Sequence, residues 1–278
     1  MLFSTLAATV FGSIVASAVP ASVPTGTGHT CPAKELWSCS TAALSNSADG
    51  CCVENKSGLV MLAAFWDIHA GSLYDFTIHG TWSDHCSGGT WDQFCDSARE
   101  YQNVTAILQD LGEYQLLQEM NNVWTNSEGS TDSFWAHEWG KHGTCFSTFN
   151  PSCYSNYKTG QEMADFFRMT VNFYHKFNVY KALERHNIVP GHKYKTEQFT
   201  KALVKEFGTV PNLQCDYTTG ELNAVWLYFH AKGPVRNLEL RPTVPNAANG
   251  CNDTIPYPTK YPGEINGHYP ELTTKFNF

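Results

Sequence analysis

The chain has 278 residues, with 18 lysines and arginines against 26 aspartates and glutamates, which gives a formal net charge of −8. This is the wrong sign for a protein that holds nucleic acid on a broad basic surface. Apolar side chains make up 42% of the sequence and aromatic side chains 14%, which excludes a disordered chain and predicts a substantial core. The charge is compatible with an enzyme that concentrates positive charge locally, by protonating histidines in a mildly acidic medium.

Residues 1–18 have the pattern of a secretory signal peptide. They contain no charged side chain and end in Ala16-Ser17-Ala18, which predicts a mature chain that starts near Val19. A membrane anchor is the alternative, but the apolar run is shorter than the ~20 residues of a spanning helix, and Pro20 follows almost at once. We therefore expect a secreted protein, extracellular or vacuolar, with no membrane attachment. Residues 19–278 are expected to form a single domain.

The apolar pattern predicts strands and helices that do not alternate regularly. Residues 58–66 are a continuous apolar run typical of a buried strand, and residues 75–79 form a second strand that ends at a glycine turn. Helical periodicity runs through residues 104–120 and again through residues 163–177. A shorter helix and two further strands are expected at residues 199–207, 222–230 and 237–241. This order predicts an α+β fold, a mostly antiparallel sheet with packed helices.

Ten cysteines follow the predicted signal peptide: Cys31, Cys39, Cys51, Cys52, Cys86, Cys95, Cys145, Cys153, Cys215 and Cys251. An even number of cysteines in a secreted protein predicts disulfide bonds, and no CxxC pair points to a metal site. The chain should therefore be stapled by five disulfides. From about residue 242 it is rich in Pro, Asn and Gly, and Cys251 would tie this segment back. Three N-x-S/T sequons predict N-glycosylation, at Asn55, Asn103 and Asn252.

The segment FWAHEWGKHGTC, residues 134–145, holds an unusual density of reactive side chains. On a helix, at ~100° per residue, four of them fall within an arc of roughly 140° and so face one cleft. These four are His137, Glu138, Lys141 and His142. A solvated polar face is the alternative, but aromatic residues interleave with the four, which does not fit a face turned to water.

A zinc site is the competing interpretation, because His-Glu opens the HExxH motif of metalloproteases. That motif needs two histidines four residues apart, whereas His137 and His142 are five apart. The sequence therefore predicts a site with no metal and no other cofactor. His79 stands at the end of a predicted strand, before Gly80, where a side chain looks into a cleft. Together His79 and His142 supply an acid and a base.

These residues carry a resemblance to the ribonuclease T2 family, in particular its fungal branch. The segments IHGTWSDHC, residues 78–86, and HEWGKHGTC, residues 137–145, are similar to the family's two active-site signatures, IHGLWPDNC and HEWxKHGTC. The resemblance implies a ribonuclease T2-like fold and a monomeric endoribonuclease of low base specificity. Such an enzyme cleaves single-stranded RNA by transphosphorylation, through a 2′,3′-cyclic phosphate to 3′-phosphate ends.

The resemblance also implies a role for each residue of the two segments. His142 would be the general base and His79 the general acid, while Glu138 orients or polarises the reacting group. His137 and Lys141 would hold the phosphate oxygens. The bases of the RNA would be bound by Trp82, Asp84, Trp91 and Phe134. Because Glu138 lies close to the histidines, it should favour their charged forms and move a bell-shaped pH–rate profile to the acid side.

The disulfide pairing implied by the resemblance joins Cys31 to Cys52, Cys39 to Cys86, Cys51 to Cys153, Cys95 to Cys145, and Cys215 to Cys251. The chain departs from the family at Ala64, where a glutamine is usual, and at Thr81 and Ser83, which replace leucine and proline. These changes leave the acids and bases untouched. They predict a weaker base preference on the downstream side of the cleaved bond.

Three other functions compete with this interpretation, of which a carbohydrate-binding protein, suggested by the aromatic content, has no sequence feature in its favour. The first is a secreted effector or cytotoxic protein that uses the same fold. A non-enzymatic effector or recognition protein would be expected to have lost one of the key residues, but all of them are present: His79, His137, Glu138 and His142. A zinc hydrolase would stop working when a chelator is added, whereas an enzyme that relies on two histidines would not.

Overall fold

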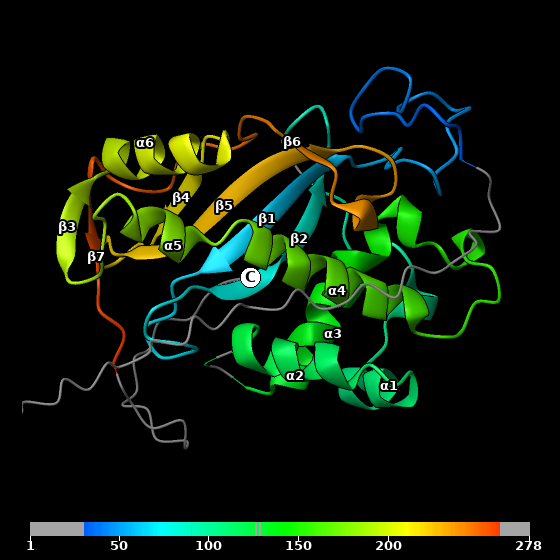
Figure 1. The fold of residues 1–278 in the computed structure, drawn as a ribbon, viewed down its shortest axis with the longest axis horizontal. Helices are drawn as coiled ribbons and strands as arrows, with labels where there is room; N and C mark the ends of the chain where they lie inside the picture. Colours follow the sequence, from blue (N-terminus) through cyan, green and yellow to red (C-terminus); the bar gives the residue numbers. More distant parts are fainter. Residues whose placement is uncertain (1–30, 90, 126, 128, 262–278) are drawn as a thin grey trace, which may run out of the picture.

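The computed structural model describes residues 31–89, 91–125, 127 and 129–261. These residues form the predicted α+β fold, an antiparallel sheet with helices packed against it and a separate pair of short strands (Figure 1). The predicted signal peptide, residues 1–18, lies outside the described residues. Within the described ranges, no helix is both long enough and apolar enough to span a bilayer.

The main sheet has the strand order β2-β1-β5-β4, and β6 also pairs with β5. In chain order the strands are β1 (Leu59–Phe65), β2 (Thr77–Asp84), β3 (His192–Lys195), β4 (Asn212–Cys215), β5 (Leu222–Ala231), β6 (Leu240–Pro242) and β7 (Thr254–Tyr257). The second sheet consists of β3 and β7. All of these strand pairs are antiparallel.

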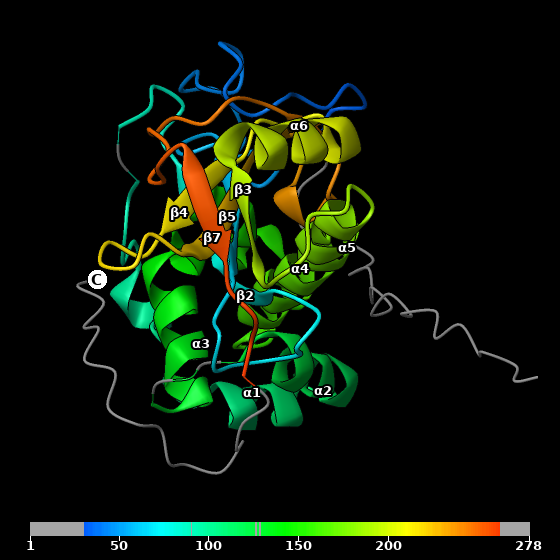
Figure 2. The ribbon, with the colours of Figure 1, turned by 90° about the vertical axis from the view of Figure 1, so that its left-hand side faces the viewer.

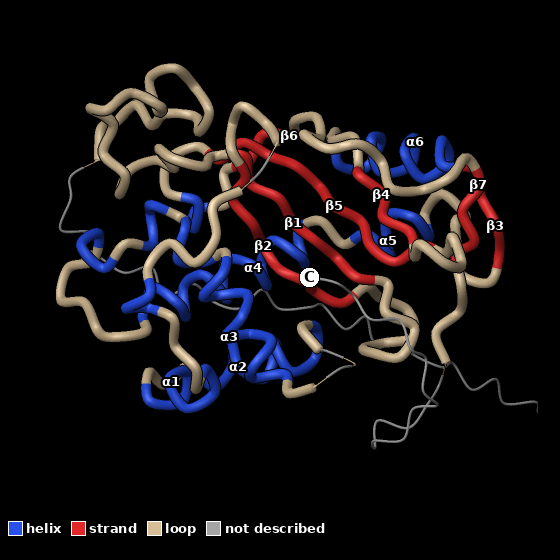
Figure 3. Tube along the Cα trace, turned by 180° about the vertical axis from the view of Figure 1, so that it is seen from behind, coloured by secondary structure: helices blue, strands red, loops and turns tan. Residues whose placement is uncertain are grey.

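The helices are α1 (Val104–Asp110), α2 (Tyr114–Val123), α3 (Thr131–Lys141), α4 (Gln161–Lys176), α5 (Val179–Glu184) and α6 (Thr196–Phe207). Short 3-10 turns add η1 (Ser97–Arg99), η2 (Gly143–Cys145), η3 (Ser147–Phe149), η4 (Pro151–Cys153) and η5 (Val235–Asn237). Helix α4 crosses one face of the sheet, and the view from behind shows the strands in front of it (Figures 1 and 3). Helices α1 and α2 lie at the opposite end of the molecule from α6 (Figure 2).

Both faces of the sheet are covered, which explains why β1 is apolar at every position. Val60 and Leu62 point into the main core, which they share with the apolar side of α4. Leu59 and Met61 point the other way, into a smaller cluster that contains Trp82. The candidate site lies against this second cluster.

Three predicted elements differ from the structure. The helix expected over residues 104–120 is divided into α1 and α2 around Gly112, whose φ of +77° a helix cannot contain. The strand expected over residues 237–241 begins only at Leu240, because Leu238 has a left-handed φ of +50°. The strand expected to end at His79 continues to Asp84.

Five disulfides join the ten cysteines in the pairing that the family resemblance implies. Two of these bonds hold the ends of the signature segments. Cys86, at the end of the first segment, is bonded to Cys39, and Cys145, at the end of the second, is bonded to Cys95. The loops that follow β2 and α3 are thus anchored covalently.

Candidate active site

His79 is the third residue of β2 and lies at a β-bulge. Ala63 of β1 pairs with Gly80 and Ala64 pairs with Ile78, so His79 is the extra residue that has no partner in β1. A bulge turns a side chain away from the regular alternation of a strand. The His79 ring stacks on the ring of Phe65, with the two centroids 4.0 Å apart. A bulge, and not the glycine turn expected from the sequence, therefore presents this histidine.

Helix α3 carries His137, Glu138 and Lys141, but His142 lies just beyond its end. His142 is the C-cap residue, and its backbone N–H donates to the Glu138 carbonyl at 3.1 Å. The helical arc predicted from the sequence therefore applies to the first three residues only. The turn between α3 and η2 sets the direction of the His142 side chain.

Glu138 is the fully buried centre of the site. Its Oε2 accepts a hydrogen bond from Trp82 Nε1 at 3.0 Å, and its Oε1 lies 3.4 Å from Nε2 of His79. Burial acts to raise the pKa of Glu138, but electrostatic attraction to His79, helped by the Trp82 hydrogen bond, prevails and lowers that pKa to about 2. Glu138 is thus a carboxylate even in acidic solution.

His142 is 2% exposed, and its ring stacks on Trp82 with the centroids 4.7 Å apart. Burial lowers the pKa of His142 to about 3, against the opposing attraction of Glu138. Among the described residues, neither Nδ1 nor Nε2 of His142 has a hydrogen-bond partner. Above about pH 3 this imidazole is therefore neutral, the form in which one ring nitrogen accepts a proton.

The pKa of His137 is also lowered, first by burial and then by the charges of Lys141 and His79, while Glu138 opposes the shift. Glu138 favours the charged forms of His137 and His142, as expected, yet the net pKa of both histidines is lowered. Glu138 acts in the expected direction, but burial outweighs it. If the pH–rate profile is shifted to the acid side, the cause would be a general base that stays neutral in acidic solution.

Gly80 leaves the space into which the Glu138 carboxylate fits. A Cβ atom at Gly80 would lie 2.2 Å from Oε2 of Glu138 and 3.0 Å from Nε1 of Trp82. Gly80 belongs to the first signature segment, where the sequence suggests that it forms a turn. In the structure it is a strand residue without a side chain, which marks the close approach of another group.

Two of the four expected base-binding residues present ring surface near the histidines. Trp91 is 39% exposed, and its ring centroid lies 6.0 Å from that of Trp82 and 6.5 Å from that of His142. Phe134 is half-buried on α3, with its centroid 5.8 Å from that of His79. One aromatic side chain thus flanks each of the two histidines.

The other two expected base-binding residues are buried. Trp82 packs against His142 and donates a hydrogen bond to Glu138. Its observed contacts are therefore with two of the candidate catalytic residues. Asp84 accepts a hydrogen bond from Asn246 at 2.9 Å through Oδ2, while its Oδ1 has no partner among the described residues. Burial raises the pKa of Asp84 to about 6, although the Asn246 hydrogen bond opposes the shift.

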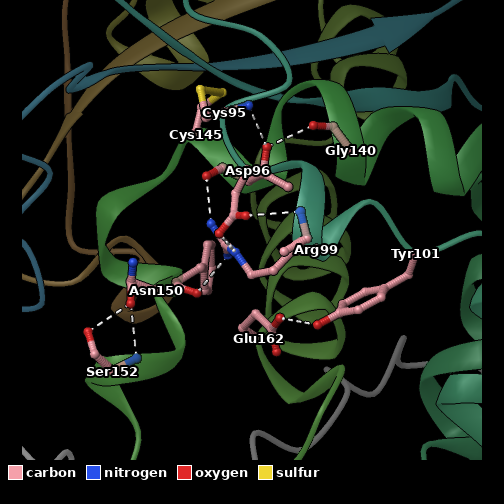
Figure 4. A network of polar contacts seen from close by, with 12 residues as sticks. Cys95, Asp96, Arg99, Tyr101, Gly140, Cys145, Asn150, Ser152 and Glu162 are labelled. Atoms are coloured by element: carbon pink, nitrogen blue, oxygen red, sulfur yellow. Dashed lines mark hydrogen bonds and ion pairs between the residues drawn. A yellow bond between two sulfur atoms is a disulfide. The ribbon is translucent and has the colours of Figure 1, made fainter.

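A hydrogen-bond network that the sequence did not predict ties the end of α3 to the loop before η1 (Figure 4). The buried Arg99 guanidinium donates to the Thr144 carbonyl at 2.9 Å and to the Asp96 carboxylate at 2.8 Å. The Thr144 hydroxyl donates to the Gly140 carbonyl at 2.7 Å and accepts from the Cys95 backbone N–H at 3.0 Å. These bonds fix the segment that carries the last residues of the site.

The fold and the site together define a class of protein. A carboxylate paired with one histidine, a second histidine that stays neutral and a flanking ammonium are the groups of a general acid–base site. Across the described ranges, no group of three or more His, Cys, Asp or Glu side chains is arranged to hold a metal ion.

Comparison with known proteins identifies the family. The sequence model of the ribonuclease T2 family matches residues 35–237. The chain is 39% identical to ribonuclease T2 of Aspergillus oryzae over 229 residues, 80% of each chain. It is 37% identical to a ribonuclease T2-like protein of Emericella nidulans over 242 residues, which are 85% of this chain and 57% of that one. The crystal structure of Actibind, a T2 ribonuclease, matches 84% of this chain and 99% of its own, with 35% identity and a TM-score of 0.78. The chain belongs to the ribonuclease T2 family.

Proposed function

We propose that this protein is a secreted, monomeric endoribonuclease that cleaves single-stranded RNA without a metal ion. Membership of the ribonuclease T2 family supports RNA as the substrate. The signal-peptide pattern of residues 1–18 supports secretion. The observation that carries the proposal is the close approach of His79 Nε2 to the Glu138 carboxylate, at 3.4 Å, beside the buried ring of His142. Internal cleavage of RNA needs one charged acid and one neutral base.

The two histidines divide the proton transfers between them. The neutral His142 imidazole takes the proton of the ribose 2′-hydroxyl, and the 2′-oxygen forms a bond to the adjacent phosphorus. The bond from phosphorus to the 5′-oxygen breaks, and protonated His79 donates its proton to that oxygen. The products are a 2′,3′-cyclic phosphate and a 5′-hydroxyl, and water then opens the cyclic phosphate to a 3′-phosphate. DNA cannot react in this way because it lacks the 2′-hydroxyl.

His137 and Lys141 are four residues apart on α3 and so share one face of the helix. They would hold the non-bridging phosphate oxygens and stabilise the charge of the phosphorane. The exposed Trp91 ring and the half-buried Phe134 ring would stack on the bases on either side of the cleaved bond, with Trp82 and Asp84 completing the Trp91 side. Ala64 is fully buried and offers a base no polar group, in keeping with a weaker downstream preference.

A direct test compares single-stranded RNA with DNA of the same sequence, each incubated with the secreted protein in the presence and absence of a chelator. We expect cleavage of the RNA alone and equal rates with and without the chelator. Loss of RNA cleavage in the chelator would contradict the metal-free mechanism and favour a zinc hydrolase. An intact RNA in every condition would favour the effector on the same fold.

The lowered pKa of His142 predicts activity that persists far into the acid range. The base must be neutral, and a pKa of about 3 keeps it neutral down to that pH, so the acidic limb of kcat/KM should fall near pH 3. Steady-state rates on single-stranded RNA across the acidic and neutral range test this. An acidic limb near pH ~6.5, the ordinary value for histidine, would contradict the assignment of His142 as the base.

Two of the three sequons are expected to carry glycans. Asn103 and Asn252 are exposed. Asn55 is half-buried, its Nδ2 donates to the Ala48 carbonyl at 2.9 Å, and it lines a polar cavity of about 630 Å³. Enzymatic deglycosylation of the secreted protein followed by peptide mass spectrometry should convert Asn103 and Asn252 to aspartate and leave Asn55 unchanged. Conversion of Asn55 to the same extent would contradict this prediction.

A further inference from the structure

Phe94 is an exposed aromatic residue in a backbone conformation that bulky residues avoid. Its φ is +52°, in the left-handed region, and its side chain is 48% exposed. Left-handed backbone is strained for a residue of this size, and such strain collects at functional sites. Core packing does not explain the strain, because nearly half of the side chain lies at the surface.

The backbone around Phe94 is held in place from both sides. The Phe94 N–H donates to the Lys141 carbonyl at 3.1 Å, at the last residue of α3. The next residue, Cys95, is bonded to Cys145 and donates to the Thr144 hydroxyl at 3.0 Å. Figure 4 shows how the Arg99 network supports the same loop. The backbone that carries the Phe94 ring is thus held by hydrogen bonds and by a disulfide bond.

The position of Phe94 connects it to the phosphate-binding side of the site. Its ring centroid lies 6.2 Å from that of His137, with the rings at 77° to each other, so the two meet edge to face. Its backbone bonds directly to Lys141. A phosphate held by His137 and Lys141 would therefore bring the neighbouring nucleotides of an RNA strand close to the Phe94 ring.

We propose that Phe94 is a stacking platform for a third base of single-stranded RNA, one outside the pair that flanks the cleaved bond. This inference rests on the proposed function and extends it. Each base of RNA has a flat π-face, so an exposed ring binds it with little regard to sequence, which suits an enzyme of low specificity. The rings assigned to the two flanking bases, Trp91 and Phe134, are separate from Phe94.

The test uses chimeric oligonucleotides that contain a single ribonucleotide, so that cleavage is confined to one bond. One substrate is the dinucleotide, and the others carry one or two deoxynucleotides added on either side. The measured quantity is the ratio of kcat/KM for the best extended substrate to that for the dinucleotide. Phe94→Leu removes the π-face but keeps an apolar side chain, and Phe94→Tyr keeps the ring. Tyr217→Leu, at a fully exposed tyrosine elsewhere, is the matched control.

We expect Phe94→Leu to lower this ratio by about tenfold, while Phe94→Tyr and Tyr217→Leu keep the wild-type ratio. A Phe94→Leu enzyme with the wild-type ratio, including one slowed equally on all substrates, would overturn the inference and leave Phe94 a structural residue. A wild-type enzyme that gains nothing from added nucleotides would overturn it as well. Failure of the wild-type enzyme to cleave any of these substrates, or long RNA, would overturn the proposed function itself.

Discussion

Replacing either His79 or His142 by phenylalanine is expected to lower kcat/KM on single-stranded RNA by about 10³-fold, within the range for loss of a general acid or base. Phenylalanine keeps a ring that can stack on Phe65 at the first position and on Trp82 at the second. The substitution therefore removes the proton-transfer groups with little change in packing. The measurement is the steady-state rate on a defined RNA, made beside a thermal unfolding curve for each variant.

His192→Phe is the matched control, because His192 is exposed on β3 in the second sheet. It should retain the wild-type rate. If a phenylalanine variant unfolds early, His79→Gln or His142→Gln gives a second test with a polar side chain. Folded variants of both positions that cleave RNA within about tenfold of the wild-type rate would contradict the two-histidine mechanism.

The second large effect is expected from Gly80→Ala. The new methyl group would lie 2.2 Å from the Glu138 carboxylate oxygen, so the carboxylate must move and its contacts with His79 and Trp82 must change. A displacement of about 1 Å in such a site lowers activity by about 10²-fold. Crowding of a packed site should also lower the free energy of unfolding by about 1–3 kcal/mol. Rates and denaturant unfolding measure the two effects.

A double-mutant cycle identifies the atoms responsible. In a Glu138→Ala background the carboxylate is absent, so Gly80→Ala should then change the free energy of unfolding by less than about 1 kcal/mol. An equal loss of stability in both backgrounds would show that the added methyl group clashes with Trp82, whose Nε1 would lie 3.0 Å away, and not with Glu138.

The long apolar runs were enough to predict the α+β class and the central strands. β1 is apolar throughout and was recognised because both of its faces are buried. The short strands were missed for the opposite reason. β3 has the sequence HKYK, mostly exposed, and only its pairing with β7, some 60 positions later, makes it a strand. Such pairings depend on tertiary contacts that no local pattern encodes.

The residues of the candidate site could be predicted from the sequence, but their arrangement in space could not. The signatures contain every acid and base, yet the sequence placed His79 at a turn and His142 on a helix. In the structure a bulge presents His79, and His142 follows the end of α3. The pKa of His142 was also expected to respond to Glu138 above all. Its burial, which outweighs that charge, depends on Trp82 of β2 and is visible only in the folded chain.

In the proposed mechanism, two histidines move the 2′-hydroxyl proton and the leaving-group proton with no metal ion. The most direct test is to digest a single-stranded RNA that has one 2′-deoxyribose at a known position, in a chelator, and to identify the new ends by mass spectrometry. The expected ends are 5′-hydroxyls and 2′,3′-cyclic phosphates or the 3′-phosphates formed from them, with only the bond after the deoxyribose left intact. Ends that carry a 3′-hydroxyl, or cleavage after the deoxyribose, would contradict the claim.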